Sequence, residues 1–194
     1  MKNSLLENIS EHNEVFSKLL NQTENLNKII KLIYKKLNLG GKILLCGNGG
    51  SAADAQHLAA EFLIRLRPNV NRDPIPAISL STDVSTITAC GNDYNFDDIF
   101  VRPFKALSKK NDVLLAISTS GNSKNVFKVL SQARKEKITT IGFLGNKGGK
   151  ASKLCDHKVI VDSQNTARIQ EAHIFLGHYI FTGVENFFLK KNKK

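Results

Sequence analysis

The chain has 194 residues, 41% of them hydrophobic, and a formal net charge of +11; these values predict one compact α/β domain and exclude a disordered chain. No apolar run approaches the roughly 20 residues that span a bilayer, and the N-terminus lacks the apolar core of a secretory signal. Cys46, Cys90 and Cys155 form no CxxC pair, which argues against a disulfide framework or a thiolate zinc site. We therefore expect a cytoplasmic protein that has no membrane partner.

The lysines are scattered along the chain, and the densest cluster is the tail at 190–194. The sequence has no RNA-binding signature, no zinc-finger spacing and no aromatic residues interleaved with basic ones. We expect a solvated surface without a nucleic-acid partner, whose charge attracts small anions over a long range.

Apolar residues recur every three or four positions over residues 1–40, which predicts one long amphipathic helix or two consecutive helices that end at Gly40 and Gly41. We expect this N-terminal helical segment to pack on another subunit as well as on its own sheet. Apolar runs then alternate with helical patterns. Strands are expected near Lys42–Gly47, Pro76–Leu80, Asp112–Ser118, Thr139–Leu144 and Lys158–Asp162.

Helices are expected near Ser51–Arg67, Ser85–Cys90, Phe96–Leu107, Ser123–Lys137 and Thr166–Leu189, followed by a frayed lysine tail at 190–194. Continuous apolar strands separated by helices predict a three-layer α/β sandwich, in which a five-stranded parallel sheet is flanked by helices. Residues 1–194 then form a single domain. In such a sheet, ligands bind beyond the carboxyl ends of the strands.

The segment GNGGSA at 47–52 formally fits the dinucleotide fingerprint G-x-G-x-x-[GA]. The second strand ends around Leu80, some 30 residues further on, whereas the acidic residue of a dinucleotide site follows after about 20. The structural alternative is a strand-to-helix turn with Ser51 as the N-cap and Asp54 as its capping-box partner. In either case the start of the helix favours an anion.

His57 and Glu61 are four residues apart on the predicted helix, so both side chains lie on one face, about 5 to 6 Å apart. An imidazole and a carboxylate in this arrangement can bind a metal or divide acid–base work. They could also form an ordinary exposed pair. The many alanines around them indicate a closely packed helix, and we therefore favour a functional role.

The segment STSGNS at 118–123 presents four hydroxyls and a glycine directly before a helix, which favours phosphate binding over an ordinary turn capped by Ser123. The last helix carries Gln170, Glu171, His173 and His178. A lone histidine on such a helix is most often structural, and His173 stays without an assigned role.

Three motifs in this order resemble those of the phosphoheptose isomerases, a branch of the sugar isomerase (SIS) domain family: CGNGGSAADAQHLAAE at 46–61, STSGNS at 118–123, and TARIQEAH at 166–173 followed by His178. The resemblance reaches to about Phe188. It implies the flavodoxin-like SIS fold and a homotetramer with active sites at subunit interfaces. It also implies conversion of D-sedoheptulose 7-phosphate to D-glycero-D-manno-heptose 7-phosphate, which opens the ADP-heptose or GDP-heptose route to lipopolysaccharide core or a surface glycan.

The resemblance further implies a set of substrate contacts: Asn48, Gly49, Gly50, Ser51, Glu61, Asn92, Asp93, Ser118, Thr119, Ser120, Ser123 and Gln170. For Asn92 and Asp93 a simple turn is an equal alternative. The resemblance implies one Zn²⁺ per site, held by His57, Glu61, Gln170 and His178, and we expect loose binding because Gln is an uncommon zinc ligand. We assign Glu61 as the base and His178 as the acid.

Gln170 and His178 are eight residues apart, which is about 12 Å along a helix. We therefore expect them to serve different sites of the tetramer, each meeting His57 and Glu61 of different protomers. Two other classes of function remain. One is a non-catalytic SIS protein that binds sugar phosphate as a sensor or acts as a replication-initiator-associated regulatory protein, and the other is a nucleotide-binding oxidoreductase. A binding module would not need Glu61 and His178 as a proton-transfer pair.

Overall fold

The computed structural model describes residues 4–191 and contains one parallel sheet of five strands. The strands are β1 (Ile43–Cys46), β2 (Ala77–Ser79), β3 (Val113–Ser118), β4 (Thr139–Gly145) and β5 (His157–Val161), in the spatial order β2-β1-β3-β4-β5. Leu45 pairs with Ser79 on one side and with Leu115 on the other. The predicted parallel sheet is confirmed. The chain connections reverse direction between β1 and β3, where such sheets open a crevice at the carboxyl ends of the strands.

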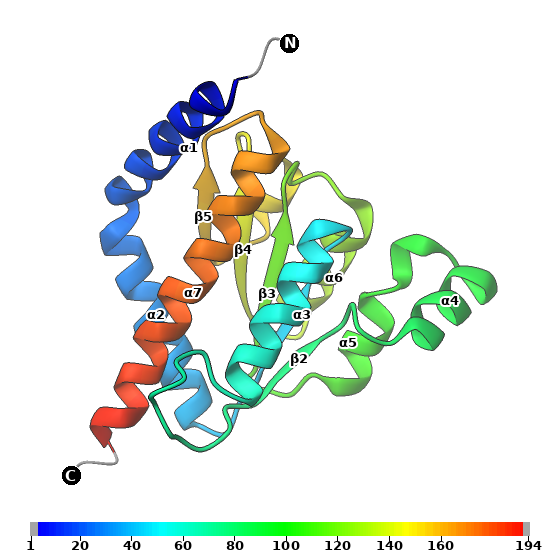
Figure 1. Ribbon diagram of the computed structural model, residues 1–194. Coiled ribbons are helices and arrows are strands. Elements are labelled where there is room, and N and C mark those ends of the chain that lie inside the picture. Colours follow the sequence, from blue (N-terminus) through cyan, green and yellow to red (C-terminus); the bar gives the residue numbers. More distant parts are fainter. Residues whose placement is uncertain (1–3, 192–194) are drawn as a thin grey trace.

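Helices cover both faces of the sheet, which confirms the three-layer sandwich (Figure 1). One layer holds α1 (Leu5–Leu19), η1 (Leu20–Gln22), α2 (Thr23–Asn38), α3 (Gly50–Leu63) and α7 (Thr166–Lys191). The other holds α4 (Val84–Asp93), η2 (Phe96–Asp98), α5 (Val101–Leu107), α6 (Lys124–Lys135) and η3 (Lys150–Lys153). Successive strand residues face opposite layers, so that Leu45 joins the core under α3 and α7, and Leu44 joins the core under α5 and α6.

Several element boundaries differ from the expected ones. The N-terminal segment forms two consecutive helices joined by η1, which is one of the two predicted alternatives, whereas the helix expected at 96–107 divides into η2 and α5. The last helix continues to Lys191, whereas residues 192–194 of the expected lysine tail lie outside the described residues. Over residues 4–191, no helix is long and apolar enough to cross a membrane.

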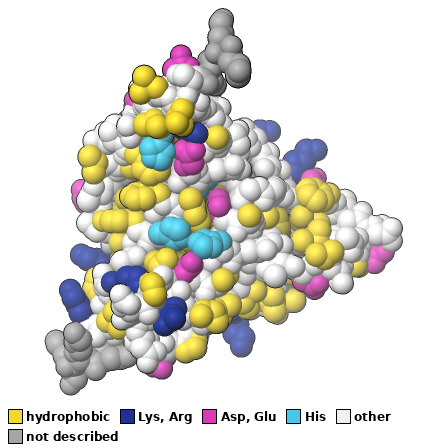
Figure 2. Space-filling model, in the orientation of Figure 1, with side chains coloured by type: hydrophobic (Ala, Val, Ile, Leu, Met, Phe, Trp, Pro, Cys, Tyr) yellow, Lys and Arg dark blue, Asp and Glu magenta, His cyan; other side chains and the backbone are white. Residues whose placement is uncertain are grey.

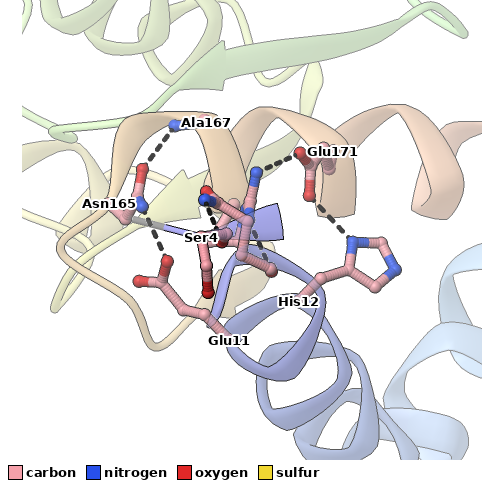
Figure 3. Close-up of polar contacts among 8 residues, drawn as sticks. Ser4, Glu11, His12, Asn165, Ala167 and Glu171 are labelled. Atoms are coloured by element: carbon pink, nitrogen blue, oxygen red, sulfur yellow. Dashed lines mark hydrogen bonds and ion pairs between the residues drawn. The ribbon is translucent and has the colours of Figure 1, made fainter. Parts of the chain in front are cut away.

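Polar contacts attach α1 to the beginning of α7 (Figure 3). Arg168 Nη1 donates to the carbonyl oxygen of Asn8 at 2.7 Å, and Asn165 Nδ2 donates to Glu11 Oε2 at 2.8 Å. His12 Nδ1 lies 2.8 Å from Glu171 Oε2. The first two turns of α7, which carry Gln170, are thereby fixed against the N-terminal helix.

Candidate functional site

The turn between β1 and α3, here called the glycine loop (Gly47–Ser51), begins the candidate site. Gly49 is the N-cap of α3 and has φ +55°, a conformation that favours glycine. The expected capping box is wrong, because Ser51 is already the second residue of the helix and is buried. Among the described residues, Asp54 Oδ2 has no hydrogen-bond partner. The N-terminus of α3, which is the positive end of its dipole, therefore lies at a loop that has little side-chain bulk.

The segment after β3, here called the hydroxyl loop (Ser118–Ser123), lies at the same edge of the sheet. Ser118 Oγ accepts the backbone N–H of Gly121 at 3.1 Å and lies 3.3 Å from Ser123 Oγ. Ser123 precedes α6 as its N-cap, but within the described part of the chain its side chain makes no capping hydrogen bond. The hydroxyl of Ser123 and the start of α6 can therefore serve an anion.

A pair of amides joins the two loops. Asn48 Nδ2 donates to Asn125 Oδ1 at 2.9 Å, and Asn125 Nδ2 donates to Asn48 Oδ1 at the same distance. Asn125 is only 2% exposed. Asn125 was not among the predicted site residues. The available signal was an amide two residues after the predicted start of the helix at Ser123, where a buried polar group must find a partner.

Helices α3 and α7 bring together what we call the His–Glu cluster (His57, Glu61 and His178). His57 Nε2 lies 2.9 Å from His178 Nε2 and 3.3 Å from Glu61 Oε1. Burial, and then the neighbouring His57, lower the pKa of His178. In Figure 2 histidine side chains with adjacent acidic groups lie near the middle of this face, among hydrophobic side chains.

The donor set of the His–Glu cluster fits a divalent metal ion. One nitrogen from each histidine and one carboxylate oxygen lie within 4.8 Å of one another. Imidazole nitrogens and carboxylate oxygens are usual zinc donors, and three protein ligands with an open fourth position are typical of catalytic zinc. The lowered pKa of His178 favours the neutral imidazole that a metal ligand must present.

Gln170 lies apart from this cluster, against the glycine loop. A Cβ placed on Gly50 would lie 2.4 Å from Gln170 Nε2, so the glycine leaves the room that this side chain occupies. The eight residues to His178 correspond to about 12 Å along α7. The structure thus brings together three of the four expected metal ligands and places Gln170 beside the expected substrate contacts.

His178 meets His57 and Glu61 of its own chain, and the prediction that Gln170 serves a different site of the tetramer stays a prediction. The contact within one chain follows from the close packing of α7 on α3, since a Cβ on Gly177 would lie 2.5 Å from Leu58 Cδ2. The eight residues between Gln170 and His178 separate the part of α7 beside the glycine loop from the part that carries the His–Glu cluster.

Asn92 and Asp93 lie elsewhere in the chain. They are exposed residues in the last turn of α4, where Asn92 Nδ2 donates to Asp93 Oδ1 at 2.9 Å. Figure 1 shows α4 projecting from the molecule on the side away from α1 and α7. Among the described residues, no hydrogen bond joins Asn92 or Asp93 to the glycine loop.

A parallel sheet with two loops suited to an anion at its carboxyl edge is typical of a SIS domain. The SIS domain family model matches residues 7–145. The chain is 45% identical to the phosphoheptose isomerase of Clostridium acetobutylicum over 95% of both chains, and 46% identical to that of Helicobacter pylori over 93% of this chain and 94% of the relative. The solved structure of the phosphoheptose isomerase from Neisseria gonorrhoeae superposes with a TM-score of 0.87 at 37% identity, covering 94% of this chain and 97% of the other. The chain belongs to the phosphoheptose isomerase family.

Proposed function

We propose that this enzyme interconverts D-sedoheptulose 7-phosphate and D-glycero-D-manno-heptose 7-phosphate. The observation that carries the proposal is the His–Glu cluster, which lies about two turns along α3 from the glycine loop, with the hydroxyl loop joined to that loop by the Asn48–Asn125 pair. From Gly50 to His57 the helix rises about 10 Å, a length comparable with an extended seven-carbon sugar phosphate. A substrate whose phosphate is bound at the loops can therefore present C1 and C2 to Glu61 and His178.

In the proposed reaction the Glu61 carboxylate removes a proton from C1 of the ketose. His178, whose Nε2 lies 2.9 Å from His57 Nε2, donates a proton to the oxygen on C2 as the enediol forms. Glu61 then returns its proton to C2 while His178 takes the proton from the oxygen on C1. The bonds made and broken balance without an external oxidant or reductant.

The phosphate is bound by the hydroxyl-loop residues that the family resemblance marks, Ser118, Thr119, Ser120 and Ser123. The resemblance marks Asn48, Gly49, Gly50 and Ser51 on the glycine loop as further substrate contacts. The Asn48–Asn125 pair fixes the spacing of the two loops. Gln170, beside Gly50, is placed to contact the sugar hydroxyls between phosphate and cluster.

We propose one Zn²⁺ per site, held by His57, Glu61 and His178. When bound, zinc would act as a Lewis acid that polarises the substrate oxygens. The chain itself must still supply Glu61 as the base and His178 as the proton donor.

We further propose a cytoplasmic homotetramer that supplies heptose phosphate for ADP-heptose or GDP-heptose synthesis, with α4 of a neighbouring protomer contributing Asn92 and Asp93. The projection of α4 supports this arrangement (Figure 1), as does the exposed apolar surface of the N-terminal segment, where Leu5 and Leu6 are 77% and 76% exposed. The whole chain of 194 residues then forms one domain whose N-terminal helices serve in assembly.

Mixed tetramers test the shared site. A Glu61→Gln chain and an Asp93→Ala chain, unfolded and refolded together, should regain activity through hybrid sites. A mixture of Glu61→Gln and His178→Ala should regain none, because each site takes both Glu61 and His178 from the same chain. Equal results from the two mixtures would contradict the proposed arrangement.

The activity itself is tested by incubating the protein with sedoheptulose 7-phosphate and separating the heptose phosphates by anion-exchange chromatography. We expect a new aldose phosphate peak in proportion to enzyme concentration. Tight binding without turnover would instead favour a regulatory SIS protein, and a fluorescence response to NAD would favour an oxidoreductase.

A further inference from the structure

Two arginines bind one buried carboxylate on α7. Glu185 is 1% exposed. Arg72 Nε lies 2.7 Å from Glu185 Oε1, and Arg67 Nε lies 2.6 Å from Glu185 Oε2. A buried carboxylate needs partners of this kind, and paired charge-assisted hydrogen bonds are the strong ones. Both arginines come from the segment between α3 and β2, so the carboxylate connects that segment to α7.

Arg72 also binds the end of α3. Its Nη2 donates to the backbone oxygen of Glu61 at 2.8 Å, and its Nη1 donates to the backbone oxygen of Phe62 at 2.9 Å. Its side chain is 2% exposed. The last four carbonyls of a helix have no partner within the helix, and a cation is favourable at that end. The guanidinium therefore serves as the C-terminal cap of α3.

These contacts connect the two halves of the His–Glu cluster. Glu185 is seven residues beyond His178, so both lie on the same face of α7, about two turns apart. Besides the His57–His178 contact, α3 and α7 pack through apolar side chains, such as the stacked rings of Phe62 and Phe181, whose centroids lie 3.7 Å apart. Apolar contacts are non-directional and allow small sliding movements, whereas the fork of Arg72 has a fixed geometry.

We propose that Arg72, anchored by Glu185, is a positioning residue that sets the separation of Glu61 and His178. It touches neither substrate nor metal, and it acts through the backbone of Glu61. Groups that orient metal ligands typically change metal affinity or activity 10- to 100-fold when altered. The expected change in turnover rests on the proposed function, whereas the expected change in metal affinity does not.

The test compares Arg72→Lys with Arg67→Lys. Both changes keep the positive charge beside Glu185, but only Arg72 holds the backbone of Glu61. For Arg72→Lys we expect zinc affinity, measured by competition with a chromophoric chelator, to fall about 10-fold or more, and kcat to fall with KM nearly unchanged. For Arg67→Lys we expect both quantities within about twofold of the unaltered protein.

The inference is overturned if a folded Arg72→Lys keeps the zinc affinity and kcat of the unaltered protein, or if Arg67→Lys loses as much. Should Arg72→Lys fail to fold, Glu185→Gln is used in its place with the same expected loss, and unchanged zinc affinity in that variant overturns the inference. If the unaltered protein binds zinc but does not turn over the heptose phosphate, the proposed function fails while the zinc comparison still decides the role of Arg72.

Discussion

Replacement of Glu61 by Gln separates catalysis from stability in this fold. The His57–Glu61 pair has its atoms 3.3 Å apart, with side chains 48% and 18% exposed, so we expect its loss to cost no more than about 0.5 kcal/mol. For a chain of this size that corresponds to a melting shift of about 1–2 °C. A lost acid–base group costs at least about a hundredfold in turnover, which is about 2.7 kcal/mol in the barrier. The variant should therefore be folded and nearly inactive.

The assay measures kcat by ³¹P NMR of the heptose phosphates, alongside thermal unfolding by circular dichroism and bound zinc. Glu24→Gln is the matched control, because Glu24 forms an exposed pair with Lys28 four residues away, with its Oε1 2.7 Å from the Lys28 Nζ. Excess zinc distinguishes loss of the base from loss of a metal ligand. Turnover near normal in Glu61→Gln, or a fall in both variants alike, would refute the assignment of Glu61 as the base.

Three further outcomes are expected. Ser120→Ala should raise KM more than it lowers kcat, because a phosphate contact acts in ground and transition states alike; an unchanged KM with a collapsed kcat would contradict this. Gly50→Ala should raise KM, because its Cβ would lie 2.4 Å from Gln170 Nε2; crystal structures of the variant would show whether that side chain is displaced. Burial lowers the pKa of His173 from 6.5 to about 4, so the unfolded chain binds a proton at this histidine more readily than the folded chain does. The free energy of unfolding should therefore fall by roughly 3 kcal/mol as the pH drops from about 6.5 to 4. Urea unfolding across this range should show the loss, and His173→Leu should lack most of it.

Local sequence patterns were sufficient to predict the sheet and the two loops. Each strand is a continuous apolar run, and the motifs follow β1 and β3 directly in the chain, so their meeting at one edge follows from parallel topology. The spacing of His57 and Glu61 likewise predicted one helix face. These features depend on neighbours in sequence or on the rules of parallel sheets.

Contacts between distant residues could not be obtained in this way. Asn48 and Asn125 are 77 positions apart, and Arg72 and Glu185 are 113 apart, so no periodicity connects them. The pairing of His178 with its own His57 depends on how closely α7 packs on α3, which is decided at Gly177 and Leu58. The sequence also indicated Ser51 as a cap, whereas a glycine with positive φ took that position.

The central claim is that Glu61 and His178 move protons between C1 and C2 of a seven-carbon sugar phosphate. The most direct measurement follows sedoheptulose 7-phosphate with this protein in D₂O by ¹H and ³¹P NMR. We predict an aldoheptose 7-phosphate that carries solvent deuterium at C2, formed by the unaltered protein and not by Glu61→Gln. Absence of this product, or its formation at equal rates by both proteins, would contradict the account.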